Sequence, residues 1–146
     1  MARRLKNTER EIFADFSDRY RLCWACGIPD GMRDASIDFT RNLERAHIIG
    51  GSGRVHDVRN LAMLCALCHR LHHGDTIRRP DGKPLPNLRF DHLLWLQYRF
   101  EGYIDREFLR SIRTSKFIPR PSIVPAWHLS QFHRWQGVEH SQWRRR

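Results

Sequence analysis

Residues 43–73, LERAHIIGGSGRVHDVRNLAMLCALCHRLHH, decide the fold, because two kinds of metal-ligand pattern overlap in them. The stretch contains one CxxC pair, and a second CxxC pair with the same spacing lies upstream of it. His69 and His73 follow at once, and residues four apart share one face of a helix. The overlap predicts one metal site that stabilises the fold and a second site at which chemistry takes place.

Four cysteines in two CxxC pairs are typical of a structural zinc site in a reducing compartment. The interval between the pairs, residues 27–64, is 38 residues long. This exceeds the roughly 15–20 residues of a simple zinc ribbon, so a structural unit is inserted between the two knuckles. Independent redox pairs or buried free thiols are the alternatives. The predicted zinc ligands are Cys23, Cys26, Cys65 and Cys68.

The charge of the chain indicates a polyanionic partner. Lys and Arg outnumber Asp and Glu by 26 to 16, which gives a net charge of +10. Most of the surplus is arginine, which binds phosphate through two parallel N–H groups. The apolar runs are too short to span a membrane, so we expect nucleic acid as the partner and no membrane. The first residues lack the apolar region of a secretory signal, and we expect a cytoplasmic location.

Apolar patterning predicts one modest α+β domain. The core is expected to run as a strand at the end of 36–49, a loop, a second strand over 60–64 and a helix over 66–73. The aromatic residues near the end of the chain either pack on the domain or stack on bases. The expected parts are an N-terminal helix (1–21), the zinc-stapled core (22–75), a basic loop with a helical extension (76–116), and a proline-rich linker with an aromatic, basic tail (117–146).

The order of these motifs resembles that of the HNH endonucleases, in particular those with two CxxC knuckles. The resemblance covers about a third of the chain. It implies a small α+β fold with a zinc-stapled ββα-metal core and flanking helices, and metal-dependent hydrolysis of DNA phosphodiester bonds. The matching sequences are Cys23-Trp-Ala-Cys26-Gly27, Ala46-His47-Ile48, Gly50-Gly51, Asn60-Leu61, Leu64-Cys65-Ala-Leu-Cys68-His69 and the final His73.

The resemblance also implies roles for single residues. His47 would be the general base that takes a proton from the attacking water, a task that suits imidazole. Asn60 would brace the loop between the strands and so orient His47. His69 and His73 would hold a catalytic divalent ion, which could be Mg, Mn, Ni, Co or Zn.

One position departs from the family pattern. The residue before the general base is commonly a metal ligand in these enzymes, and here it is Ala46, which has no donor atom. Glu44 and Asp57 are the nearest carboxylates that could replace it, and the third protein ligand stays open. His72 offers a second way to chelate an ion with His69, whereas we interpret His56 as an exposed loop residue.

The sequence leaves three functions in competition. The first is a DNA endonuclease of low sequence specificity that contacts mainly the phosphate backbone, encoded by a bacterium or phage and acting alone or as a homodimer. The second is a catalytically inactive, zinc-stabilised nucleic-acid-binding module, and the third is a zinc module that recruits proteins through its aromatic tail. The arginines expected to contact DNA are Arg45, Arg54, Arg70, Arg78 and Arg79.

Overall fold

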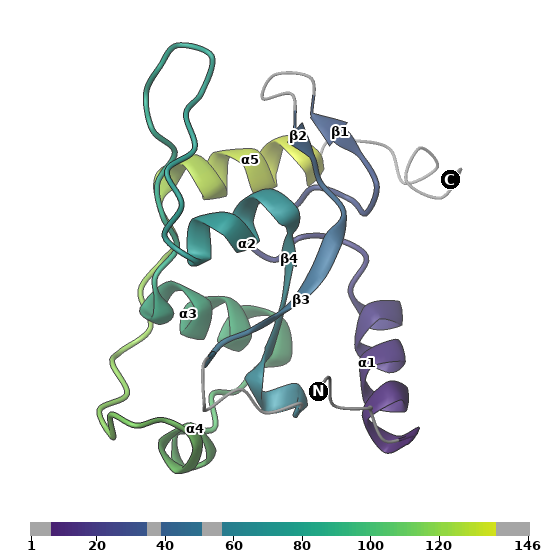
Figure 1. Ribbon diagram of the computed structural model, residues 1–146, viewed down its shortest axis with the longest axis vertical. Helices are drawn as coiled ribbons and strands as arrows, with labels where there is room; N and C mark the ends of the chain where they lie inside the picture. The colour runs from purple at the N-terminus through teal and green to yellow at the C-terminus, as the bar shows by residue number, and fades with distance from the viewer. Residues whose placement is uncertain (1–6, 35–38, 51–56, 137–146) are drawn as a thin grey trace, which may run out of the picture.

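Two antiparallel strands, β3 (Leu43–His47) and β4 (Leu61–Cys65), lie at the centre of the computed structural model (Figure 1). The helix α2 (Ala66–His72) begins directly after β4. The fold is therefore α+β, and the expected order of strand, loop, strand and helix is confirmed. The structure describes residues 7–34, 39–50 and 57–136.

Helices cover both faces of this hairpin (Figure 1). The helix α1 (Asn7–Arg19) lies on one face, and α2 and α3 (Phe90–Glu101) lie on the other. Successive side chains of a strand point to opposite faces. Accordingly, Arg45 of β3 donates a hydrogen bond to α1, whereas the preceding residue, Glu44, contacts α2. The strand β3 therefore presents different side chains to the two sides of the molecule.

The core is centred on β4. All five of its residues are buried, as expected for a strand that is covered on both faces. In β3 only Ala46 is buried, and the remaining residues are partly or fully exposed. Each fully buried aliphatic side chain contributes about 1.5–3 kcal/mol of hydrophobic stabilisation. β4 thus anchors the hairpin, while β3 is left accessible.

Two further elements support the loop end of the hairpin. α3 ends at Gly102, whose φ of 81° is a left-handed conformation that glycine adopts readily. The side chain of Asp105 then accepts a hydrogen bond from the backbone of Phe108 and begins α4 (Arg106–Ile112). Asp105 also forms an ion pair of 3.2 Å with Arg59, in the short 3-10 turn η2 (Val58–Asn60). The turn that leads into β4 is thereby joined to α4.

The last helix, α5 (Ala126–Gln136), packs against the first CxxC knuckle. Gly27 closes that knuckle with a φ of +76°, and a Cβ atom there would lie 2.9 Å from the Cα of Phe132. Only glycine allows both the backbone conformation and this close approach. Phe132 and Trp135 of α5 are buried. Residues 137–146 of the expected tail lie outside the described residues.

A second, smaller hairpin pairs β1 (Arg33–Asp34) with β2 (Phe39–Thr40). The sequence did not indicate it, because strands of two residues are too short to show an alternating pattern. Beyond α2, an antiparallel bridge between Arg78 and Pro84 closes a loop that projects from the body at the upper left of Figure 1. Among the described helices, none is long and apolar enough to cross a lipid bilayer.

Candidate metal centres and active site

Four buried cysteine side chains converge where the first knuckle meets the start of α2. Their sulfur atoms all lie within 4.8 Å of one another, and the sulfurs of Cys26 and Cys65 are 3.7 Å apart. A tetrahedral zinc ion with Zn–S bonds of about 2.3 Å would hold its sulfurs about 3.8 Å apart. The donor type and the spacing therefore fit zinc. The sequence prediction is confirmed to this extent: Cys23, Cys26, Cys65 and Cys68 are positioned for a zinc site.

Burial disfavours the charged form of the Cys23, Cys65 and Cys68 thiols, although hydrogen bonds from the other three cysteines bring the pKa of Cys23 below its usual value. Burial raises the pKa of the Cys65 thiol, and hydrogen bonding to Cys23 and Cys26 raises that pKa further. A metal ion reverses the preference because it binds the thiolate directly and releases the proton. The affinity of the cluster for zinc should therefore fall as the pH is lowered.

An arginine that the sequence did not single out lies against the cluster. Arg41 is completely buried, and its Nη1 donates to the sulfur of Cys26 over 3.6 Å. Its Nη2 forms an ion pair of 3.1 Å with the buried carboxylate of Asp34. Burial by itself lowers the pKa of Arg41, but the charges of Cys26, Cys65, Cys68 and Asp34 raise it above the usual value. The guanidinium thus offsets negative charge that four thiolates bring to a divalent ion.

The helix α5 completes the surroundings of the cluster. His128 is completely buried, and burial lowers its pKa to about 4, although the charge of Cys23 acts in the opposite direction. Arg134 reaches the carboxylate of Asp34 at 3.3 Å. These two residues follow the last cysteine by many positions and belong to no metal-binding pattern. Nothing in the sequence indicated that they would lie near the zinc site.

The second group of metal-ligand residues lies at the surface, between β3 and the end of α2. The Nε2 atoms of His69 and His73 are 3.0 Å apart, and the Nδ1 atom of His69 is 2.8 Å from the carboxylate of Glu44. Two imidazole nitrogens that bind one ion at about 2.0–2.1 Å, at an angle of about 90–110°, would be about 2.8–3.4 Å apart. The two histidines therefore fit one shared ion.

The contact with Glu44 orients the His69 ring. An ionised carboxylate can only accept a hydrogen bond, so Nδ1 of His69 donates to Glu44, and in the neutral ring the Nε2 atom that faces His73 carries the lone pair. A carboxylate behind a ligating imidazole orients the ring and raises its basicity. Glu44 thus supports the candidate ion site through His69.

The two carboxylates considered as a third ligand differ in their surroundings. Asp57 accepts hydrogen bonds of 3.0 Å from the guanidinium of Arg59 and 2.9 Å from its backbone N–H. Glu44 contacts the ring nitrogen of His69 that points away from His73. Ala46 is completely buried and offers no donor. Among the described residues, the four cysteines form the one group of three or more ligand side chains with converging donor atoms.

His47 ends β3 and pairs with Leu61. By strand alternation its side chain belongs to the face that carries Arg45, opposite to Glu44. Its backbone is tied to α2 through the partly buried ring of His72. Burial lowers the pKa of His72, and hydrogen bonding to the backbone of Leu88 and of His47 acts in the opposite direction. The backbone of His47 therefore lies beside α2, whereas its side chain belongs to the face of β3 that is turned toward α1.

Asn60 joins the two ends of the loop between β3 and β4. Its side chain is completely buried, accepts a hydrogen bond of 2.8 Å from the backbone N–H of Ile49 and donates one of 3.1 Å to the Ile49 carbonyl. Its own carbonyl accepts a hydrogen bond of 2.9 Å from the backbone of Ile48. These bonds hold the chain directly after His47, which is where a residue that positions the general base would have to act.

We expect the Asn60→Ala variant to lose about 2–4 kcal/mol of unfolding free energy, because two buried backbone groups of Ile49 would lose their partners. Urea denaturation would measure the loss. Asn42→Ala, which truncates an exposed asparagine, is the matched control and should change stability by less than about 0.5 kcal/mol. Equal stability of the two variants would show that the side chain of Asn60 does not brace the loop.

The arginines expected to contact DNA are spread over several elements. Arg70 in α2 pairs with Asp75 at 2.9 Å, and Arg79 in the projecting loop pairs with Asp81 at 2.8 Å. Exposed ion pairs of this kind are weak, so a phosphate can replace the carboxylate. Arg78 donates to the carbonyl of Gly82, and Arg45 faces α1. Arg54 lies outside the described residues, as does His56.

Comparison with known proteins adds one finding. A family model described as HNH endonuclease matches residues 23–75. These residues extend from the first cysteine of the cluster to just beyond His73. The resemblance inferred from the sequence is thereby confirmed. Neither the curated proteins nor the solved structures contain a match to the chain.

Proposed function

Because residues 23–75 match the HNH endonuclease family, we propose that the chain is a metal-dependent endonuclease that hydrolyses phosphodiester bonds in DNA. The observation that carries this proposal is the arrangement of His69, His73 and Glu44, in which two imidazole nitrogens converge and a carboxylate holds one of the rings. The site lies at the surface, where a DNA phosphate can approach it. The net charge of +10 favours such a polyanionic substrate.

In this proposal the Nε2 atoms of His69 and His73 would hold the ion. A divalent ion there would supply positive charge for the phosphate and for the leaving 3′ oxygen. His47 takes a proton from water as the water oxygen attacks the phosphorus atom, and the bond from phosphorus to the 3′ oxygen breaks. Asn60 positions His47 through the backbone of Ile48 and Ile49. Glu44 keeps the His69 ring in the binding tautomer.

A supercoiled-plasmid assay tests the proposal. The purified zinc protein is incubated with the plasmid in EDTA, and then with added Mg, Mn, Ni, Co or Zn. Cutting that requires an added ion would support the endonuclease. Intact plasmid under every ion, together with a salt-sensitive mobility shift, would instead support an inactive nucleic-acid-binding module. The specific observation that favours this second function is Ala46, which leaves two histidines as the converging protein donors of the site.

Variants of Glu44 test its supporting role. We expect Glu44→Ala to weaken binding of the catalytic ion about 10–100-fold, the usual effect of removing a carboxylate behind a histidine ligand. Glu44→Gln keeps an acceptor for the Nδ1 proton of His69 and should lose less. Titration of the zinc-loaded protein with Mn, followed by paramagnetic relaxation of water protons, gives the affinity without relying on cleavage.

A charge-matched control is Glu107→Ala, on the exposed side of α4. It removes the same charge at a distance from the histidine pair and should leave the affinity for Mn unchanged. If Glu44→Ala and Glu107→Ala bound Mn equally well, the carboxylate would have no part in the site.

A further inference from the structure

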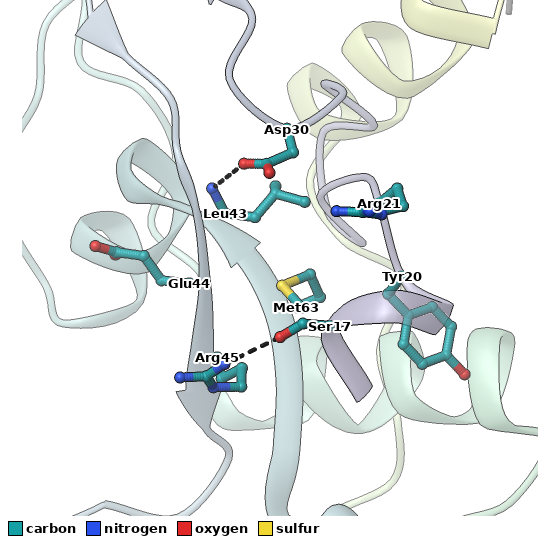
Figure 2. Close-up of a pocket in the computed structure, with 8 residues that line it drawn as sticks. All are labelled: Ser17, Tyr20, Arg21, Asp30, Leu43, Glu44, Arg45 and Met63. Atoms are coloured by element: carbon teal, nitrogen blue, oxygen red, sulfur yellow. Dashed lines mark hydrogen bonds between the residues drawn. The ribbon is translucent and has the colours of Figure 1, made fainter. Parts of the chain in front are cut away.

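A pocket of about 330 Å³ lies between α1 and β3, on the face of β3 opposite to the histidine pair. Figure 2 shows its composition. Leu43 provides apolar surface in the pocket, and the nearly buried Met63 lies behind it. Arg45 and Ser17 line one side, and Arg21 lines another. Glu44 is the one residue of the pocket wall that also belongs to the candidate ion site, through its contact with His69.

Of the two arginines of the pocket, Arg45 is held in place by side-chain contacts, and both keep free binding capacity. Arg45 Nη1 donates to the hydroxyl of Ser17 over 3.0 Å, and its guanidinium lies 4.7 Å from the ring centre of Phe13. Figure 2 shows the guanidinium of Arg21 directed toward Leu43. In the part of the chain that the structure describes, neither arginine has a carboxylate partner in an ion pair. An arginine has five N–H donors, so most of those of Arg45 remain available.

The carboxylates at the pocket are turned to other partners. Asp30 accepts a hydrogen bond of 3.1 Å from the backbone N–H of Leu43. Glu44 contributes to the wall, but its carboxylate points away from the pocket in Figure 2 and contacts His69. The pocket therefore presents two guanidinium groups beside the partly buried side chain of Leu43. This combination suits a phosphodiester group, whose charge would meet the arginines.

We infer that this pocket binds a backbone phosphate of the nucleic-acid substrate, next to the phosphate that is cut. The inference rests on the proposed function and extends it. Arg45 and His47 are two positions apart on the same face of β3, and two residues of a strand span about 6.6 Å. This is comparable to the repeat of one nucleotide along a strand. A phosphate held by Arg21 and Arg45 would therefore place its neighbour at the end of β3, beside His47.

Binding measurements on the full-length zinc protein test the pocket. The probe is a fluorescently labelled DNA duplex, and anisotropy is recorded without added divalent ions so that the DNA stays intact. We expect Arg21→Gln and Arg45→Gln each to weaken binding about 5–10-fold. Each should also lower the slope of log affinity against log salt by about one unit, as expected for one lost phosphate contact.

The control is Arg110→Gln on α4, which removes the same charge from an exposed arginine away from the pocket. It should bind DNA nearly as well as the unaltered protein. Zinc content and circular dichroism verify that each variant is folded. Arg45→Lys is a milder second variant, because it keeps the positive charge but lacks the paired N–H donors of a guanidinium. Its affinity should fall between those of the unaltered protein and Arg45→Gln.

The outcomes separate the pocket from the nuclease proposal. If the unaltered protein cuts plasmid but the pocket variants bind DNA like Arg110→Gln, the pocket proposal is overturned and the nuclease stands. If the pocket variants lose affinity while no ion produces cutting, the nuclease fails and the pocket stands as a phosphate site. If the unaltered protein binds no DNA, both are overturned.

For an active protein, the Arg21 and Arg45 variants should raise KM and leave kcat nearly unchanged, because the contact between phosphate and arginine forms before the chemical step.

Discussion

The Cys65→Ser variant should not fold. Cys65 is both a predicted zinc ligand and the residue that ends β4 and caps α2, where its sulfur accepts a hydrogen bond from the backbone of Cys68. Zinc binding to a structural four-ligand site provides about 10–16 kcal/mol at neutral pH. The net stability of a domain is only about 5–15 kcal/mol. Zinc binding is therefore a contribution as large as the whole stability, and the loss of one of its four ligands weakens it enough to unfold the domain.

Zinc content, measured by inductively coupled plasma mass spectrometry, and thermal unfolding, followed by circular dichroism, would establish the result. Met63→Leu in the same strand is the matched control, because it keeps the volume and the apolar character of a buried residue without touching a ligand. It should unfold cooperatively and retain zinc. A Cys65→Ser protein that melts at the unaltered temperature without zinc would show that the cysteines are free thiols or redox pairs.

The His47→Ala variant should fold, bind zinc and bind DNA, yet cut DNA at least about 10²-fold more slowly. This is the scale on which loss of a general base reduces a proton-transfer step. His47 is partly exposed at the end of β3, so its removal opens no large cavity. The rate of plasmid cutting at saturating metal, compared with DNA affinity in the absence of added ions, isolates the chemical step from binding.

A control for this variant is His133→Ala, an exposed histidine in α5. It changes the same residue type, but on α5, which carries none of the residues proposed for catalysis. Cutting by His133→Ala should match the unaltered protein. If His47→Ala also cut at the unaltered rate, or if it failed to fold, the role assigned to His47 would lose its support.

The sequence predicted those features that depend on local spacing. The two CxxC pairs indicated a four-cysteine cluster, and the cluster is present. The apolar run of residues 60–64 indicated a strand, and β4 covers Leu61–Cys65. The pair of His69 and His73 was placed on one helical face, and their rings meet there. Each of these follows from the period of a strand or a helix, or from the short reach of a chelating loop.

The remaining features depend on which distant segments meet. Arg41 belongs to no motif, and its contact with Cys26 arises only when β2 and the zinc knuckle are packed together. The contact of Glu44 with His69 depends on the register of β3 against β4 and on the direction of α2. The pocket beside β3 requires α1 to lie against a strand that follows it by more than twenty residues. Single-sequence patterns do not encode these relations, because period and spacing describe one segment at a time.

The close packing of Gly27 against Phe132 bears on where the cooperative unit of this protein ends. The recognisable family segment stops at residue 75, but its first knuckle is covered by α5. Trp24 within that knuckle also stacks on Phe100 of α3, with ring centres 5.2 Å apart. Excision of residues 23–75 would expose these apolar surfaces to water. The segment that carries the family pattern is therefore shorter than the segment that unfolds as one piece. The cooperative unit extends at least to α5.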